Sequence, residues 1–504
     1  MRNAAVLHWL AANLQGGDRM RFTFDPQPGL STTPILAVEV NLQCRDEIIP
    51  ILRALQHVYG EPELRREILK LVGQDVNRYS SRKRGRKGMD YWQVIVLAAV
   101  RLGCNLNFDK LQDLAEQHRA LRQIMGIGAW DVHVHFDWRR IRDNIDWLRP
   151  QTLRKINECI VAAGHRLAPK AAESVRGDSF VVETNIHYPT DSSLIGDGLR
   201  KILQVGAALA AVLRIRGWRQ HQHLLKKMRG LVRAINTATR SRARNKSERI
   251  QTAYQPLFQF ADELLRRARD LEWRSGRATG LEALALRQQL QHFRQLTERV
   301  CGYSKRRVLH GEVIPNREKL FSMFETHTEL IRRGKMPEEN QFGHSVLVIE
   351  DGVGFICAYQ VMPAGRQDRD VVVPELRKLQ TRLRGKIRRA SFDQAFHSSE
   401  NQEAFAEIVA MPCVPIPGAP GADQHANVEF RRARQNHPGV ESAINGLQAG
   451  NGLKRCRDGT ELGYDRYVGL GVLGRNLHVL GKVLLAWEAR DSEAARSKRK
   501  CLCA

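Results

Sequence analysis

Three acidic residues occupy positions at which a phosphoryl-transfer site could form. Asp178 lies within Ser174–Thr184, Asp393 follows Ile387–Phe392, and Glu441 lies in a helical stretch further along the chain. Carboxylate oxygens are the ligands that Mg²⁺ prefers. A pair of such ions stabilises both the attacking and the leaving oxygen of an in-line displacement. We therefore expect Asp178, Asp393 and Glu441 to be catalytic residues and ligands of two Mg²⁺ or Mn²⁺ ions.

Each of these residues taken alone has a structural interpretation. An isolated Asp is commonly a turn or cap residue, and Glu441 would suit a solvated helix face. Three other acidic residues are weaker candidates. Strand alternation places Glu183 on the face opposite Asp178, Asp191 suits a turn or cap, and Glu429 suits a helix start. The order of the elements and the basic chain favour the chemical interpretation of the trio.

The elements that must position the trio alternate between strand and helix. Ser174–Thr184, Ser345–Ile349 and Gly354–Val361 are predicted strands, and Glu350-Asp351-Gly352 is a hairpin turn between the last two. A helix (Pro374–Leu383), a strand (Ile387–Phe392), a helix (Ser399–Val409), a strand (Cys413–Ile416) and the glutamate helix follow. This order predicts an α/β fold class (α+β, mixed sheet) with an RNase H-like catalytic core.

The charge of the chain indicates a polyanionic partner. Its 504 residues include 80 Lys and Arg against 54 Asp and Glu, a net charge of +26. From Arg200 to Ser247 there are thirteen basic residues and no acidic ones, whereas an ordinary solvated helix face mixes both signs. We expect this stretch to bind nucleic-acid phosphates. The candidate DNA-binding residues are Arg214, Arg216, Arg219, Lys226, Lys227, Arg240, Arg242 and Arg244. Trp218 and Trp273 could stack on a base, but core packing is favoured for both.

A second candidate DNA-binding region lies near the N-terminus. Helical periodicity over Trp92–Ala99 and Phe108–Ala115, with a turn at Gly103-Cys104-Asn105, outlines a helix-turn-helix, although many helical hairpins bind nothing. A basic run precedes it and supplies further DNA-binding candidates: Arg82, Lys83, Arg84, Arg86 and Lys87.

The combination of motifs resembles the DDE transposases of bacterial insertion sequences, most closely the ISNCY type. The resemblance covers about residues 20 to 487. It rests on the runs Gly177–Ser192, Lys319–Lys335, Ser391–Asp393, His437–Ile444 and Tyr467–Leu477. It implies metal-dependent cleavage at transposon ends and attack of the freed 3′-hydroxyl on target DNA. It also implies a homodimer in the synaptic complex and no membrane partner.

The chain departs from some related transposases around the glutamate. Those relatives carry Tyr, Arg and Lys at positions where this chain has Arg434, His437 and Gln448. Phosphate contacts are therefore expected from Arg431, Arg432, Arg434 or His437. The gap between the fifth strand and the glutamate helix is short, so a hairpin intermediate is not implied.

The predicted organisation has five parts. They are an N-terminal segment (1–43, with Met20 a candidate start), a helical DNA-binding domain (44–167), the catalytic domain (170–196 with 313–487), a basic helical insertion (197–312) and a basic tail (488–504). Tyr467–Trp487 carries three basic or His residues, which predicts a buried helix rather than a membrane span.

Cysteine usage favours a reduced, intracellular compartment, and we expect a cytoplasmic protein associated with the nucleoid. The nine cysteines include no C-x-x-C pair, so neither a zinc ribbon nor a disulfide framework is indicated. The opening residues lack the pattern of a signal peptide. His133 and His135 alternate but lack an evident third metal ligand. Two other functions remain open: a non-catalytic DNA-binding remnant of a transposase, and an RNase H-like nuclease that cuts without joining.

Overall fold

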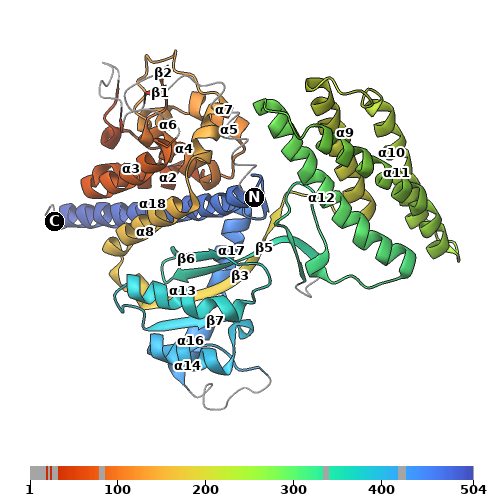
Figure 1. The fold of residues 1–504 in the computed structure, drawn as a ribbon. Helices are drawn as coiled ribbons and strands as arrows, with labels where there is room; N and C mark the ends of the chain where they lie inside the picture. Colours follow the sequence, from red (N-terminus) through yellow and green to blue (C-terminus); the bar gives the residue numbers. More distant parts are fainter. Residues whose placement is uncertain are drawn as a thin grey trace. The chain divides into compact units, whose positions relative to one another are not determined.

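The computed structural model describes residues 19–20, 23–24, 32–78, 86–332, 340–417 and 427–502. The chain divides into two compact units. The first, here called the insertion unit, comprises the described residues of Ile186–Phe342. The second, the sheet unit, comprises the described residues up to Asn185 and from Gly343 onward. Figure 1 draws the chain with its elements labelled.

A mixed seven-stranded sheet, counted over the described residues, gives the chain its α/β character. Its strands are β3 (Ser174–Thr184), β4 (Glu329–Arg332), β5 (Asn340–Asp351), β6 (Ile356–Val361), β7 (Arg389–Phe392), β8 (Met411–Cys413) and β9 (Arg455–Cys456). The order is β4-β5-β3-β7-β8, with β6 also paired to β5 and β9 to β3. β5 runs antiparallel to β3 and β6, whereas β3, β7 and β8 are parallel. The predicted α/β class and mixed sheet are confirmed.

Helices cover both faces of this sheet. They are α13 (Asp368–Arg382), α14 (Ser399–Ile408), α16 (Val428–Asn436), α17 (Gly439–Asn445) and α18 (Glu461–Leu502). On one face Phe392 stacks on Phe405 of α14, with ring centroids 5.3 Å apart. On the other face Arg176 of β3 donates to the backbone carbonyl of Asn436, at the end of α16. The α16–α17 corner therefore lies on the face that carries Arg176.

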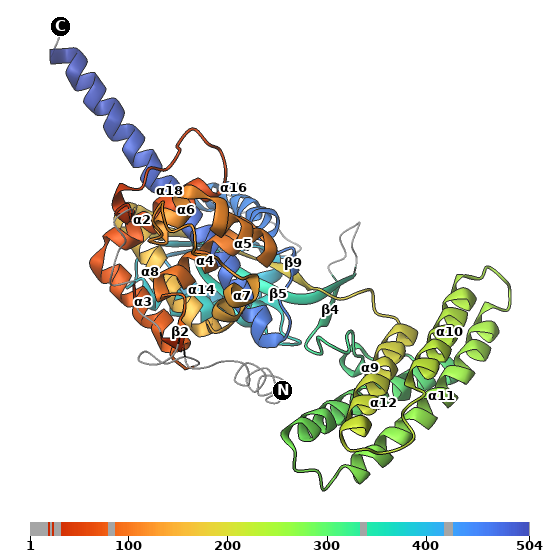
Figure 2. The same ribbon diagram turned by 90° about the horizontal axis from the view of Figure 1, so that it is seen from above.

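The N-terminal helices share one hydrophobic core with the sheet. They are α2 (Ile48–Gly60), α3 (Pro62–Val76), α4 (Tyr91–Gly103), α5 (Phe108–Gln117), α6 (Arg119–Ile124), α7 (Trp138–Asp146) and α8 (Pro150–Leu167). The long helix α18 packs against α2, α4 and α8. Figure 2 shows the C-terminal part of α18 extending beyond these helices. Glycines allow this close approach, because a Cβ on Gly474 would lie 2.5 Å from the backbone nitrogen of Gly103.

The helix-turn-helix outline is present as α4 and α5, but its surface is not basic. Every residue of α4 except Gln93 is buried. On α5 the exposed residues include Asp109 and Asp113 as well as Lys110. An acidic surface repels phosphates, so α5 lacks the charge expected of a helix that enters the major groove.

One helix, α18, is long and apolar enough over Glu461–Asp491 to cross a membrane. However, 72% of its most apolar window is buried inside the protein. The predicted buried helix over Tyr467–Trp487 is therefore confirmed.

Four long helices form the insertion unit: α9 (Asp191–Val212), α10 (His221–Arg240), α11 (Lys246–Arg274) and α12 (Leu281–His310). They pack on one another around their own hydrophobic core (Figure 1). Trp218 is buried in that core, and a Cβ on Gly206 would lie 2.4 Å from its ring. Trp273, by contrast, is 81% exposed, so the prediction of core packing is confirmed for Trp218 and wrong for Trp273.

Candidate active site

The sheet brings Asp178 and Asp393 to neighbouring positions. In the parallel pair β3–β7, Gly177 pairs with Phe392, and the next residue of each strand is an aspartate. Asp393 keeps an extended backbone, with φ −78° and ψ 168°. Neighbouring strands lie about 4.8 Å apart, and paired residues share a face. Asp178 and Asp393 therefore occupy adjacent positions on the face that carries Arg176.

Two side chains from α16 and the following turn approach the exposed Asp393 carboxylate. Arg434 donates to the carbonyl of Phe392 at 3.0 Å and lies 3.5 Å from Oδ1 of Asp393. His437 Nε2 lies 3.6 Å from the same oxygen, and its Nδ1 is hydrogen-bonded to Ser391 at 3.1 Å. His437 is buried, and that burial, with Arg434 nearby, lowers its pKa to about 4. The imidazole is therefore neutral near pH 7.

Glu441 lies exposed in the first turn of α17, which packs against β3. The start of this helix is held by Arg176. Its guanidinium donates to the Asn436 carbonyl at 2.8 Å, and a Cβ on Gly439 would lie 2.2 Å from Nη1 of Arg176. Glycine is therefore the residue that lets α17 begin directly over Arg176.

Arg176 is itself fixed by a buried carboxylate on β5. Its Nε donates to Glu350 at 2.7 Å, and Arg475 of α18 lies 3.8 Å from the other oxygen of Glu350. Burial raises the pKa of Glu350, and the two arginines oppose that shift. Neither Arg176 nor Glu350 was expected from the sequence to support the site. The sequence pattern that could have indicated Arg176 is the alternation of side chains along β3, because Arg176 lies two residues before Asp178 and so shares its strand face.

The three weaker acidic candidates have structural partners or positions of their own. Glu183 pairs with Arg455 at 2.8 Å, and Asp191 lies in the first turn of α9 and pairs with Arg307 at 2.8 Å. Glu429 lies in the first turn of α16. The positions of Glu183 and Glu429 agree with the secondary and helix-start roles predicted for them. The cap predicted at Asp191 is Thr190 instead, and Asp191 is the first residue of α9.

The candidate DNA-binding residues fall into three groups. Arg82, Lys83 and Arg84 lie outside the described residues, and only the backbone of Arg86 and Lys87 is described, as β2 (Arg86–Lys87) paired to β1 (Arg19–Met20). On the insertion unit all the predicted candidates are exposed: Arg214, Arg216, Arg219, Lys226, Lys227, Arg240, Arg242 and Arg244. On α16, Arg431 and Arg432 are exposed, whereas Arg434 and His437 face Asp393.

A second cluster of potential metal ligands lies elsewhere in the sheet unit. His165, Asp351 and Cys357 each offer one ligand atom, and these atoms lie within 4.8 Å of one another. His133 and His135, in contrast, are both exposed. The sequence pointed to Asp351 only as a hairpin-turn residue, and the three ligands are too far apart in the chain to form a spacing motif.

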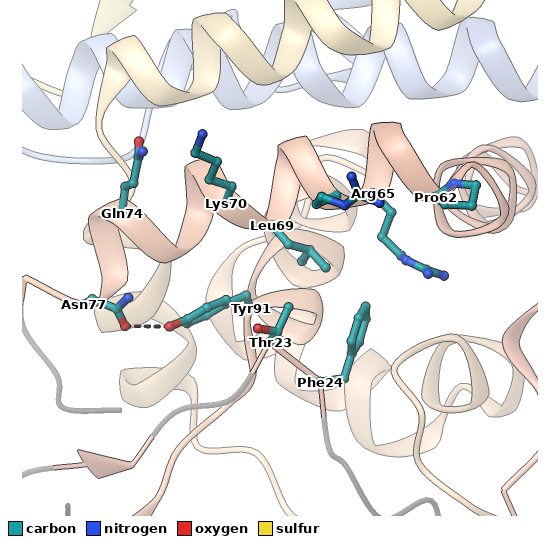
Figure 3. Close-up of a pocket in the computed structure, with 10 residues that line it drawn as sticks. Thr23, Phe24, Pro62, Arg65, Leu69, Lys70, Gln74, Asn77 and Tyr91 are labelled. Carbon is teal, nitrogen blue, oxygen red and sulfur yellow. Dashed lines mark hydrogen bonds between the residues drawn. The ribbon is translucent and has the colours of Figure 1, made fainter. Parts of the chain in front are cut away.

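A basic pocket of about 440 Å³ lies on the N-terminal helices (Figure 3). Arg65, Lys70 and Tyr91 are among its lining residues, and Tyr91 donates to Asn77 at 2.6 Å. None of the three candidate carboxylates lines it.

No protein-family model, curated protein or solved structure matches the chain.

Proposed function

We propose that this chain is a DDE transposase with an RNase H-like catalytic core, which cleaves transposon ends and joins them to target DNA. The observation that carries the proposal is the adjacency of Asp178 and Asp393 at neighbouring parallel strands, with α17 and Glu441 held over the same face. The strand order supports it. Numbered 1 to 5 in chain order, the central strands β3, β5, β6, β7 and β8 lie in the sheet in the order 3-2-1-4-5. The second of them, β5, is antiparallel to both of its neighbours, β3 and β6, which suits the predicted core.

The donor set fits Mg²⁺, because all three candidate ligands are carboxylates and Asp393 and Glu441 are exposed. When bound, two such ions would stabilise charge on the attacking and leaving oxygens of the phosphodiester. Arg434 would limit repulsion between the carboxylates and orient Asp393. We assign His437 to positioning Asp393 rather than to contacting phosphate, because its imidazole is buried and neutral.

The insertion unit supplies a surface suited to DNA. Exposed basic residues follow α10 and the segments that flank it, and Lys226, Arg229 and Arg233 form no ion pair within the described part of the chain. Cations without an acidic partner remain available to replace the counterions of a phosphate backbone. Arg431 and Arg432 on α16 offer two further exposed cations close in sequence to Glu441.

The test compares Asp393→Asn with wild type on a DNA duplex that carries the sequences flanking the gene. Because the amide removes a metal ligand without changing side-chain size, Mg²⁺-dependent cleavage and strand transfer should fall by about three or more powers of ten. Binding in a gel shift should stay within about twofold. Asp113→Asn, on an exposed residue of α5, is the matched control and should keep full activity.

The same assay separates the proposal from its alternatives. Cleavage without any joined product would indicate a nuclease, and binding without cleavage by the wild type would indicate a non-catalytic remnant. Full cleavage by Asp393→Asn would place the active site elsewhere in the protein.

A further inference from the structure

The cluster of His165, Asp351 and Cys357 joins three elements of the sheet unit. His165 lies in the last turn of α8, Asp351 ends β5, and Cys357 lies in β6. His165 Nε2 is 2.7 Å from Oδ2 of Asp351, and Sγ of Cys357 is 3.9 Å from that nitrogen and 3.7 Å from that oxygen. The Asp351 side chain is fully buried, and Cys357 is 3% exposed. A nitrogen, an oxygen and a sulfur thus face one another inside the core.

The surrounding backbone fixes the direction of the carboxylate. Oδ1 of Asp351 accepts three backbone N–H groups, those of Val353, Gly354 and Phe355, at 2.9 to 3.0 Å. Gly354 permits this turn with a φ of +109°. Because Oδ1 is fully used by the turn, Oδ2 is left to face His165 and Cys357. Metal ligands are commonly oriented by such additional hydrogen bonds.

The separations suit three of the four ligand positions of a tetrahedral zinc ion, and the cluster in the described part of the chain offers no fourth protein ligand, so a water would complete the set. With metal–ligand bonds of about 2.0 Å to nitrogen or oxygen and about 2.3 Å to sulfur, tetrahedral neighbours are about 3.3 Å apart for N and O and about 3.6 Å apart for pairs that include S. The observed N–S and O–S separations exceed that by a few tenths of an ångström or less. Only the separation between His165 Nε2 and Asp351 Oδ2, now a hydrogen bond, would have to increase, by about 0.6 Å.

We propose that His165, Asp351 and Cys357 form a zinc site distinct from the magnesium site of the proposed function. A sulfur ligand favours Zn²⁺ over Mg²⁺. The charges also balance, since a carboxylate, a thiolate and a neutral imidazole neutralise a divalent ion in the core. Binding releases the Cys357 thiol proton to solvent as the Zn–S bond forms, and the proton between His165 Nε2 and Asp351 Oδ2 moves to Nδ1 of the imidazole, which stays neutral. Arg382 donates to the Cys357 carbonyl and pairs with Glu158.

The position of the site indicates a structural role. Zinc would link the end of α8 to the β5–β6 hairpin, and so the N-terminal helices to the sheet. The Asp351 and Cys357 side chains that would bind it are buried. We expect stabilisation of the folded protein without a direct effect on cleavage chemistry.

The first test measures metal in the full-length protein purified without chelator. About one zinc per chain is expected, with loss of thermal stability on chelation and recovery on adding zinc back. Replacement with Co²⁺ should give a thiolate-to-metal charge-transfer band in the wild type. Protein that takes up no zinc and shows no such band would overturn the proposal without any mutation.

Variants then locate the ion. Cys357→Ala should lose the zinc, the band and the response to chelator, whereas Cys413→Ala, another buried cysteine of the same unit, should keep all three. Asp178→Asn should also keep the zinc, because it alters only the proposed magnesium site. Zinc retained by Cys357→Ala but lost from Asp178→Asn would show that the ion binds at the proposed magnesium site instead.

Discussion

Basic residues are used in opposite ways in the core of the sheet unit and on α10 of the insertion unit. In the sheet unit, Arg101 pairs with Asp458 and Arg149 with Asp75, and the carboxylate of each pair is largely buried. In the insertion unit, the basic residues of α10 are exposed and form no ion pair within the described residues. Cations of the same formal charge therefore pair with largely buried carboxylates in the core of the sheet unit, but lack acidic partners on α10.

The same contrast exists within the insertion unit. On α11 and α12, Arg269 pairs with Glu298, Lys305 with Asp262, and Arg306 with Glu312 and Glu318. On α10, Lys226, Arg229 and Arg233 have no such partners among the described residues. Net charge alone therefore does not distinguish α10 from α11 and α12, whereas the distribution of acidic partners does.

The largest effect in this comparison is expected from α10. Replacing Lys226, Arg229 and Arg233 together by Gln should weaken binding to a random-sequence DNA duplex by about ten- to a hundredfold at low salt. The slope of log affinity against log salt should fall by about three, close to one for each phosphate that is no longer neutralised. Fluorescence anisotropy over a series of salt concentrations measures both quantities.

The matched control removes three cations that already have acidic partners. Changing Arg269, Lys305 and Arg306 to Gln lowers the net charge by the same amount, but the affinity and the salt slope should change much less. Equal losses in the two triple variants would show that total charge, and not the unpaired surface of α10, governs binding.

A smaller effect is expected at the α16–α17 corner of the sheet unit. Gly439→Ala forces a methyl group against the Arg176 guanidinium, which cannot retreat easily because Glu350 and the Asn436 carbonyl hold it. We expect a loss of about 1–3 kcal/mol in stability. Displacement of α17 and Glu441 should lower cleavage about tenfold and raise the Mg²⁺ concentration needed for half-maximal rate.

Gly450→Ala is the control for this variant, because a Cβ there meets no atom within 4 Å. It should retain wild-type stability and metal dependence. If Gly439→Ala lost stability without any change in metal dependence, Arg176 would support the fold but not the position of Glu441.

The smallest effect is expected from acid. Burial, with Lys482 and Arg475 nearby, lowers the pKa of His478 on α18 to about 4. The unfolded chain takes up this proton near pH 6.5, so stability should be lost as pH falls from about 6.5 to about 4. His478→Gln should remove about 1–2 kcal/mol of that loss, as measured by denaturant unfolding across this range. His223→Gln, at an exposed position on α10, should leave the pH dependence unchanged.

Local pattern predicted the elements with strong signals of their own. The run of Phe180, Val181 and Val182 marks β3, which the structure bounds at Ser174–Thr184 as predicted. The predicted helix start at Pro374 is wrong by six residues. Gln367 caps α13 instead, so Pro374 falls within the helix. Likewise β8 begins at Met411 rather than Cys413, because pairing with Arg389 of β7 sets where it starts.

Residue type and short spacing were enough to predict the order of the five central strands and the helices between them, the basic stretch and the three candidate carboxylates, but not the short strands β4 and β9. Which side chains meet was decided by the tertiary structure alone. The adjacency of Asp178 and Asp393 follows from the β3–β7 register, and the grouping of His165, Asp351 and Cys357 from packing α8 on the hairpin. Register and packing arise from contacts between residues distant in the chain, so no local pattern could specify them.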